Sequence, residues 1–188
     1  LFALDAATGR PCADFGNGGQ IDLTRGVAGI RNSGDYELKS APAVVDNDRV
    51  DSPSGIVRAF DARTGQLRWS WDAIPKHLAP TGGGNAWVAM SVDAERGLVY
   101  VPTGSASPDH WGGLRPGDNL YANSLVALRA STGERVWHFQ VVRHDLWDYD
   151  IPAPAALVTV RRDGREIPAV AQATKMGFVF VLDRETGE

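Results

Sequence analysis

The sequence predicts an all-β protein whose strands are grouped into the blades of a β-propeller. Three observations support this prediction. Glycine (21 residues) and proline (11 residues) separate short apolar runs, which is typical of many short strands joined by turns. One segment pattern recurs four times along the 188 residues. One of the repeated units contains four consecutive strand-like runs, which is the number of strands in a propeller blade.

Each copy of the repeat is an apolar run, an aspartate-like position, two variable residues and Thr-Gly. The copies are LFALDAATGRP, VRAFDARTGQLRW, LVALRASTGERVW and VFVLDRETGE. The segment fits a tight hairpin turn, since aspartate and threonine side chains can cap backbone groups and glycine accepts a positive φ. Two copies are followed by a tryptophan, Trp69 and Trp137, and we expect each to pack its flat ring against the neighbouring unit.

The third unit shows the predicted blade most clearly. Its strand-like runs are AWVAMSVD, GLVYVPTG, NSLVALRA and ERVWHF. The second unit is shorter, because only DNDRVDSP (46–53) stands where the third unit has GLVYVPTG, so a strand is missing there. A true deletion, which would expose a sheet edge, and a gap in the sequence both remain open. An ordinary β-sandwich with recurring turns is the alternative fold, and the regularity of the repeat argues against it.

Composition narrows the classes of function. The net charge of -4 argues against a nucleic-acid partner. The sequence contains no run of about 18 apolar residues and no signal peptide, and its one cysteine, Cys12, cannot form an internal disulfide. It opens on Leu1 within a strand-like run and stops at LDRETGE, where a strand should follow, so we expect a piece of a longer protein.

The segment RHDLWDYDIP (143–152) gathers three aspartates, a histidine, an arginine and a tryptophan after the strand-like run RVWHFQVV. It is either an acidic turn or a functional site. Other candidate motifs are weaker. The GGG at 82–84 lacks the strand–loop–helix context and the Lys-Ser/Thr of a phosphate-binding loop. The histidines His77, His110 and His138 show no metal-ligand spacing.

The Thr-Gly-Trp repeat resembles the tryptophan-docking motif of the eight-bladed quinoprotein propellers, dehydrogenases that use pyrroloquinoline quinone (PQQ). Three further stretches resemble the membrane-bound glucose dehydrogenase branch: GNAWVAMSVDAERGLVYVPTGSASPDHWGG, YANSLVALRASTGERVWHFQVVRHDLWDYDIPAPAAL and PAVAQATKMGFVFVLDRETGE. The resemblance implies about three to four of eight blades, so residues 1–188 would be a partial β-propeller and a fragment of a larger catalytic domain. The fragment alone is expected to be inactive.

The resemblance also implies a function. A glucose-like sugar or another alcohol would be oxidised by hydride transfer to bound PQQ, with electrons passed on to a quinone acceptor. Ca²⁺ or Mg²⁺ would act beside the quinone as a Lewis acid. The protein would work in the periplasm and would contact the membrane only through parts outside this chain. The family's methanol-oxidising members carry adjacent cysteines, which this sequence lacks, so the sugar-oxidising branch is favoured.

Three residues match the family's motifs. Asp148 in HDLWDYD corresponds to the catalytic base that takes the proton from the substrate hydroxyl, although a solvated turn aspartate is the alternative. Lys175 in QATKMGF corresponds to the lysine that donates hydrogen bonds to the quinone oxygens, although it could be a surface lysine. Trp87 in GNAWVAM corresponds to the floor under the PQQ ring, although it could pack blades as Trp69 and Trp137 are expected to do.

The surroundings of these residues are less determined. His144 and Asp145 are expected to shape the loop and orient Asp148, while the roles of Trp147 and Asp150 stay open.

The metal site stays unknown. Ser105 stands where the methanol-oxidising relatives have an asparagine ligand, and no ligands are assigned among Asp46, Asn47 and Asp51.

Two other functions remain open. A non-enzymatic propeller could use the same blades as a protein-binding scaffold, like those in outer-membrane assembly; WDYD followed by Lys175, 27 residues after Asp148, argues against it. A truncated paralogue could have lost the metal site, as Ser105 and the short blade allow.

Overall fold

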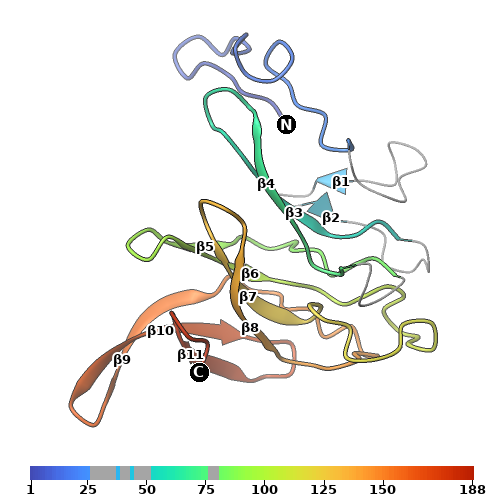
Figure 1. Ribbon diagram of the computed structural model, residues 1–188, viewed down its shortest axis with the longest axis vertical. Coiled ribbons are helices and arrows are strands. Elements are labelled where there is room, and N and C mark those ends of the chain that lie inside the picture. Colours follow the sequence, from blue (N-terminus) through green and yellow to red (C-terminus); the bar gives the residue numbers. More distant parts are fainter. Residues whose placement is uncertain (26–36, 39–42, 45–51, 76–80) are drawn as a thin grey trace.

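The structure is a computed structural model that describes residues 1–25, 37–38, 43–44, 52–75 and 81–188. All regular structure within these ranges is β-strand, and all the named strands pair antiparallel, which confirms the all-β prediction. Figure 1 shows the sheets following one another in chain order, from the N-terminal segment at the top to the last strands at the bottom. The described part of the chain contains no helix with the length and apolar character needed to cross a membrane.

Eleven strands form four sheets in the part of the chain that the structure describes. The strands are β1 (Glu37–Leu38), β2 (Ala43–Val44), β3 (Ile56–Phe60), β4 (Leu67–Asp72), β5 (Ser91–Asp93), β6 (Leu98–Pro102), β7 (Ser124–Arg129), β8 (Arg135–Gln140), β9 (Ala156–Arg162), β10 (Arg165–Ala173) and β11 (Val179–Asp183). Their orders within the sheets are β1-β2, β3-β4, β5-β6-β7-β8 and β11-β10-β9.

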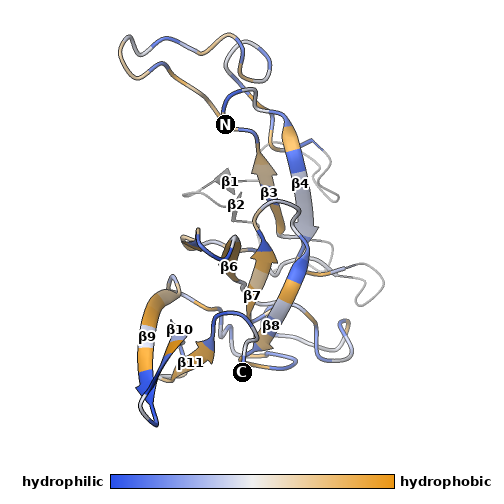
Figure 2. Cartoon of the chain, turned by 60° about the vertical axis from the view of Figure 1, so that its left-hand side comes forward, coloured by the Kyte–Doolittle hydropathy of each residue, from blue (hydrophilic) through white to orange (hydrophobic). Residues whose placement is uncertain are grey.

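The sheet β5-β6-β7-β8 confirms the predicted four-stranded blade. Its strands pair antiparallel in sequence order, and the loop between β6 and β7 is a long insertion. β7 is buried over its first five residues, because other elements cover both of its faces. Figure 2 shows its hydrophobic character as an orange strand in the middle of the molecule. The predicted missing strand at 46–51 lies outside the described residues.

The Thr-Gly segments form the predicted turns. In the first, second and fourth copies the aspartate accepts hydrogen bonds from the threonine hydroxyl and amide, as Asp61 does from Thr64. The third copy has Arg129 instead, and its turn still closes through the Gly133 amide, which donates to the Arg129 carbonyl at 2.8 Å. The backbone turn therefore forms without the carboxylate.

The two tryptophans of the repeat dock on the glycine turn of the next unit, as the repeat predicted. A Cβ on Gly133 would lie 2.6 Å from the Trp69 ring, and a Cβ on Gly187 would lie 2.8 Å from the Trp137 ring. The indole N–H of Trp69 donates to the Ala130 carbonyl, and that of Trp137 to the Arg184 carbonyl, both at 2.9 Å.

The first unit lacks a tryptophan, and Phe15 takes its place. This residue is 5% exposed, and a Cβ on Gly65 would lie 3.2 Å from the Phe15 ring. The sequence pattern did not reveal this contact, because it was defined by tryptophan.

A polar joint connects the last two sheets. The Arg184 guanidinium donates to Asp93 Oδ2 at 3.2 Å and also to the carbonyls of Ala169 and Val158. Asp93 also pairs with Arg96, whose Nε bonds Glu185. Beside the joint, a shared apolar core runs from Leu98 in β6 to Leu182 in β11. The two blades therefore pack as neighbours.

Candidate active site

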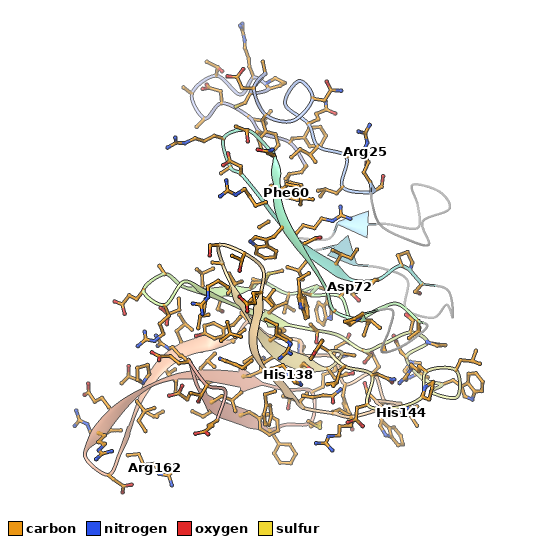
Figure 3. The ribbon with its side chains drawn as sticks, viewed as in Figure 1. Arg25, Phe60, Asp72, His138, His144 and Arg162 are labelled. Carbon is orange, nitrogen blue, oxygen red and sulfur yellow. The ribbon has the colours of Figure 1, made fainter. Side chains whose placement is uncertain are left out.

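The candidate site is built from segments at the ends of strands. Residues 141–155 join β8 to β9 and contain the RHDLWDYDIP segment. Figure 3 shows His144, at the start of this segment, at the opposite side of the molecule from Arg162 in the β9–β10 hairpin. The end of β6, the segment before β5 and the end of β10 add further residues to the site.

Asp148 and Lys175 meet, although 27 residues separate them. The Lys175 ammonium lies 3.0 Å from Asp148 Oδ2 and also donates to the Asp148 carbonyl at 2.7 Å. Both side chains are about one-third exposed, so solvent-borne molecules can reach them. Asp148 has a φ of 57°, in the left-handed region that aspartate tolerates better than most residues.

Asp150 links this pair to Trp87. One oxygen of its carboxylate, Oδ2, accepts the indole N–H of Trp87 at 3.1 Å and lies 3.7 Å from Lys175 Nζ. The other, Oδ1, accepts the Ser105 amide at 2.5 Å. Burial raises the pKa of Asp150 above its usual value, against the Ser105 hydrogen bond, and the charge of Asp148 adds to the increase. Asp150 is therefore a central member of the site whose role the sequence left open.

Trp87 differs from the docking tryptophans in its partner. Trp69 and Trp137 donate their indole N–H groups to carbonyls of the glycine turns, whereas Trp87 donates to a carboxylate. Its half-buried ring is thus tied to the cluster that holds Asp148.

Asp145 is buried and organises the backbone around Asp148. Its Oδ1 accepts the Trp147 amide at 2.9 Å, and its Oδ2 accepts the Tyr149 amide at 2.7 Å. The same Oδ2 accepts the Ser105 hydroxyl at 2.7 Å and the Asn123 amide group at 3.0 Å. Because these two backbone amides flank Asp148, Asp145 fixes the backbone on both sides of Asp148 and so orients its side chain.

Arg115 is a fully buried cation that supports the same loop, and sequence reasoning missed it. Its guanidinium donates to the Asp145 carbonyl, to Asn119 Oδ1 at 2.6 Å and to the carbonyls of Pro108 and Asp109. Burial lowers the pKa of Arg115, and the charges of Asp145 and Asp109 oppose that effect. Nothing in the local sequence, LRPGD, distinguishes this arginine from a surface one.

The remaining loop residues lie on either side of the cluster. The imidazole Nδ1 of His144 lies 2.8 Å from the Gly117 carbonyl, so this side chain connects the two loops. Trp147 is 74% exposed and points away from the core.

The described residues contain no group of three or more His, Cys, Asp or Glu side chains that could hold a metal ion. Ser105, at the expected ligand position, is fully buried, and its hydroxyl is bonded to Asp145 and Asn123. Asp46, Asn47 and Asp51 lie outside the described residues.

The cluster has a defined chemical capacity. Asp148 can accept a proton, Lys175 can donate hydrogen bonds to carbonyl or carboxylate oxygens, and Trp87 offers a flat aromatic ring. Together they suit a planar, oxygen-rich molecule bound next to a proton acceptor.

Comparisons with known proteins identify the family of the chain. The family described as "PQQ: Glucose/ethanol/alcohol dehydrogenase, beta-propeller domain" matches residues 1–188. A glycerol dehydrogenase large subunit and a quinoprotein glucose dehydrogenase, both from Gluconobacter oxydans (strain 621H), are each 40% identical over the whole chain. A quinoprotein glucose dehydrogenase from Escherichia coli (strain K12) is 37% identical. The chain spans 26–28% of the lengths of these relatives.

Solved structures give the same result. A quinohemoprotein alcohol dehydrogenase, ADHIIG from Pseudomonas putida HK5, superposes with a TM-score of 0.77 at 32% identity, covering 100% of this chain and 30% of its own. The quinohemoprotein alcohol dehydrogenase from Comamonas testosteroni has a TM-score of 0.67 at 36% identity, covering 72% of this chain and 24% of its own.

Proposed function

Because this chain belongs to the family of PQQ-dependent dehydrogenases with a β-propeller domain, we propose that it forms part of the active site of an enzyme that oxidises a sugar or another polyol. The observation that supports this most directly is the pairing of Asp148 with Lys175 at 3.0 Å, beside Trp87. Residues 1–188 would then be a partial propeller within a larger catalytic domain.

The substrate class is a polyhydroxy alcohol, with a glucose-like sugar as the first candidate. Relatives named for glycerol and for glucose are equally similar to this chain, at 40% identity. A relative named quinate/shikimate dehydrogenase (quinone), from Acinetobacter baylyi, is 38% identical and supports a quinone as electron acceptor. Cys12 is the one cysteine of the chain, so the chain lacks the adjacent cysteines that the methanol-oxidising members of the family carry. This difference favours a sugar over methanol as the substrate.

The residues present fit PQQ, which is planar and rich in carbonyl and carboxylate oxygens. Lys175 would hold it through hydrogen bonds, since its ammonium is partly exposed, and the half-buried Trp87 ring would stack on it. When bound, PQQ supplies the two-electron oxidant that no side chain can supply.

Asp148 performs the proton chemistry. Conversion of an alcohol to a carbonyl compound removes the proton of the hydroxyl group and a hydride from the carbon; the Asp148 carboxylate would take the proton, and bound PQQ would be the acceptor of the hydride. Lys175 orients this carboxylate through Oδ2, and Asp145 orients its backbone.

The enzyme would also bind Ca²⁺ or Mg²⁺ beside PQQ, and none of the described residues is assigned as a ligand of the ion. The hydroxyl of Ser105 is engaged with Asp145, so that position is a poor hard-ion ligand in the arrangement described. The working protein would be periplasmic and attached to the membrane through parts outside this chain.

The test is a titration of the full-length natural protein with PQQ in the presence of Ca²⁺ or Mg²⁺, followed by tryptophan fluorescence. We expect saturable, metal-dependent quenching that is lost in Trp87→Ala and Lys175→Ala. Trp111→Ala, an exposed tryptophan outside the cluster, is the matched control and should retain the quenching. Absence of quenching in the wild-type protein would contradict the proposal.

This titration, together with an activity assay on sugars and polyols with the same protein, separates the other candidate functions. PQQ binding without turnover of sugars or polyols would favour an inactive paralogue, for which Ser105 is the motivating observation. Failure to bind PQQ would favour a scaffold.

A further inference from the structure

We propose that Asp150 is a positioning residue that holds the Trp87 ring and the Lys175 ammonium in a fixed relation to Asp148. The inference rests on the proposed function for its effect on cofactor binding, but its structural part concerns the protein alone. Asp150 lies two residues after Asp148 and is 8% exposed.

Both carboxylate oxygens of Asp150 are used. Oδ1 accepts the Ser105 amide at 2.5 Å, which anchors the side chain to the end of β6. Oδ2 accepts the Trp87 indole N–H at 3.1 Å and lies 3.7 Å from Lys175 Nζ. One atom therefore connects the aromatic ring and the cation.

The backbone leaves the carboxylate little room to move. A Cβ added to Gly104 would lie 2.6 Å from Asp150 Oδ1 and 3.2 Å from its Cγ. Because even a methyl group at position 104 would displace the carboxylate, glycine there is part of the same arrangement.

The charges agree with a positioning role. Asp148 and Asp150 share one cation, Lys175, at 3.0 and 3.7 Å from its nitrogen. The Asp148 charge raises the pKa of Asp150 in addition to burial. Lys175 is therefore held between two carboxylates and has few alternative positions.

Asp150→Asn reverses the polarity of one atom while keeping the shape. The Ser105 amide requires an acceptor at Oδ1, so the new NH₂ group faces the Trp87 N–H and the Lys175 ammonium, which are both donors. The bond to Trp87 is lost and the ring is released, while Lys175 keeps its two hydrogen bonds to Asp148 but loses its second carboxylate. Because a hydrogen bond to a charged group is lost, we expect PQQ affinity to fall about tenfold or more.

The experiment uses the full-length protein labelled with 5-fluorotryptophan and studied by ¹⁹F NMR without cofactor. The Trp87 resonance is assigned with Trp87→Phe. We expect Asp150→Asn to shift or broaden this resonance, and Asp163→Asn, a 92% exposed hairpin aspartate, to leave it unchanged. Gly104→Ala, which displaces the carboxylate without removing it, should have the same effect and replaces Asp150→Asn if that variant does not fold.

PQQ titrations of the same variants give the second readout. Asp150→Asn should weaken binding in the wild-type background and much less in the Trp87→Phe background, because the two residues act through one bond. An unchanged Trp87 resonance together with unchanged affinity overturns the inference, and so does full additivity of the two substitutions. If the wild-type protein does not bind PQQ but the resonance still moves, the proposed function fails while the positioning of Trp87 by Asp150 stands.

Discussion

Asp148 has a backbone conformation that few residues adopt, and its neighbours maintain it. The amides on either side of it donate to the buried Asp145 carboxylate, and its own carbonyl accepts the Lys175 ammonium. A φ of 57° is unfavourable for most side chains, and asparagine is among the few that tolerate it. This tolerance permits a substitution that removes the carboxylate with little change in backbone strain.

We expect Asp148→Asn to fold and to bind PQQ but to lose kcat by about 10²–10⁴-fold, the usual contribution of a general base. Steady-state assays with a sugar or polyol on the full-length protein measure this. Asp163→Asn, also at a positive φ, is the control and should keep full activity. A loss of less than a few-fold in Asp148→Asn would show that another group takes the proton.

Asp145→Asn is expected to destabilise the protein. Asp145 is 2% exposed and its carboxylate accepts four hydrogen bonds, whereas an amide can accept at only one of its two terminal atoms. The loss should be about 2–4 kcal/mol in the free energy of unfolding. Urea denaturation measures it, and Asp118→Asn, a half-exposed aspartate, should have little effect.

Candidate site residues could be named from the sequence where they stand in a recognisable local motif. Residues whose role depends on contacts with distant parts of the chain could not be assigned that role in this way. Asp148, Lys175 and Trp87 stand in motifs that can be recognised alone, although their roles remain proposals. Asp150 depends on Ser105 and Trp87, 45 and 63 residues away, and no local pattern shows such contacts. Arg115 is similar, because its burial follows from loops that close over it.

At the level of elements, the repeat is a turn and an aromatic side chain that meets the next turn. The strands β5 to β8 were predictable because alternating apolar residues and glycine turns are local signals. The replacement of tryptophan by Phe15 was not, because a sequence pattern does not show which ring reaches Gly65.

Gly133→Ala tests the docking contact. Gly97 also has a positive φ, but a Cβ added there would meet no atoms within 4 Å, so Gly97→Ala measures backbone strain alone, about 1–2 kcal/mol. Gly133→Ala adds a methyl group 2.6 Å from the Trp69 ring and should cost about 1–3 kcal/mol more. Urea denaturation of both variants measures the difference, and equal losses would mean that the contact is loose.

At the scale of the whole molecule, neighbouring blades are joined by a charged contact as well as by apolar packing. Burial raises the pKa of Asp93, but hydrogen bonds from the Arg96 amide and the Arg184 guanidinium, with the charge of Arg96, outweigh it and hold the pKa below its usual value. A depressed folded-state pKa stabilises the protein above the unfolded pKa of about 4, and the contribution is lost as the pH falls through the folded value.

Stability should therefore decrease on acidification below about pH 4, and Asp93→Asn should reduce that decrease. The variant should also lose about 2 kcal/mol at neutral pH, where Arg184 loses a charged partner. Urea denaturation at about pH 6 and about pH 3 measures both effects. If the wild-type protein and the variant lose the same unfolding free energy on acidification, that loss comes from other carboxylates, such as Asp183, whose pKa is also lowered.

The docking of each aromatic ring on the next glycine turn has an evolutionary consequence. Phe15 meets Gly65, Trp69 meets Gly133 and Trp137 meets Gly187, so the second and third units each contribute one ring and one turn. A duplicated unit would bring both halves of this contact with it and could join the series without a newly evolved interface. Insertions between strands, such as the loop that contains Arg115, leave the contact untouched. The series can thus grow by copying while individual loops diverge toward new substrates.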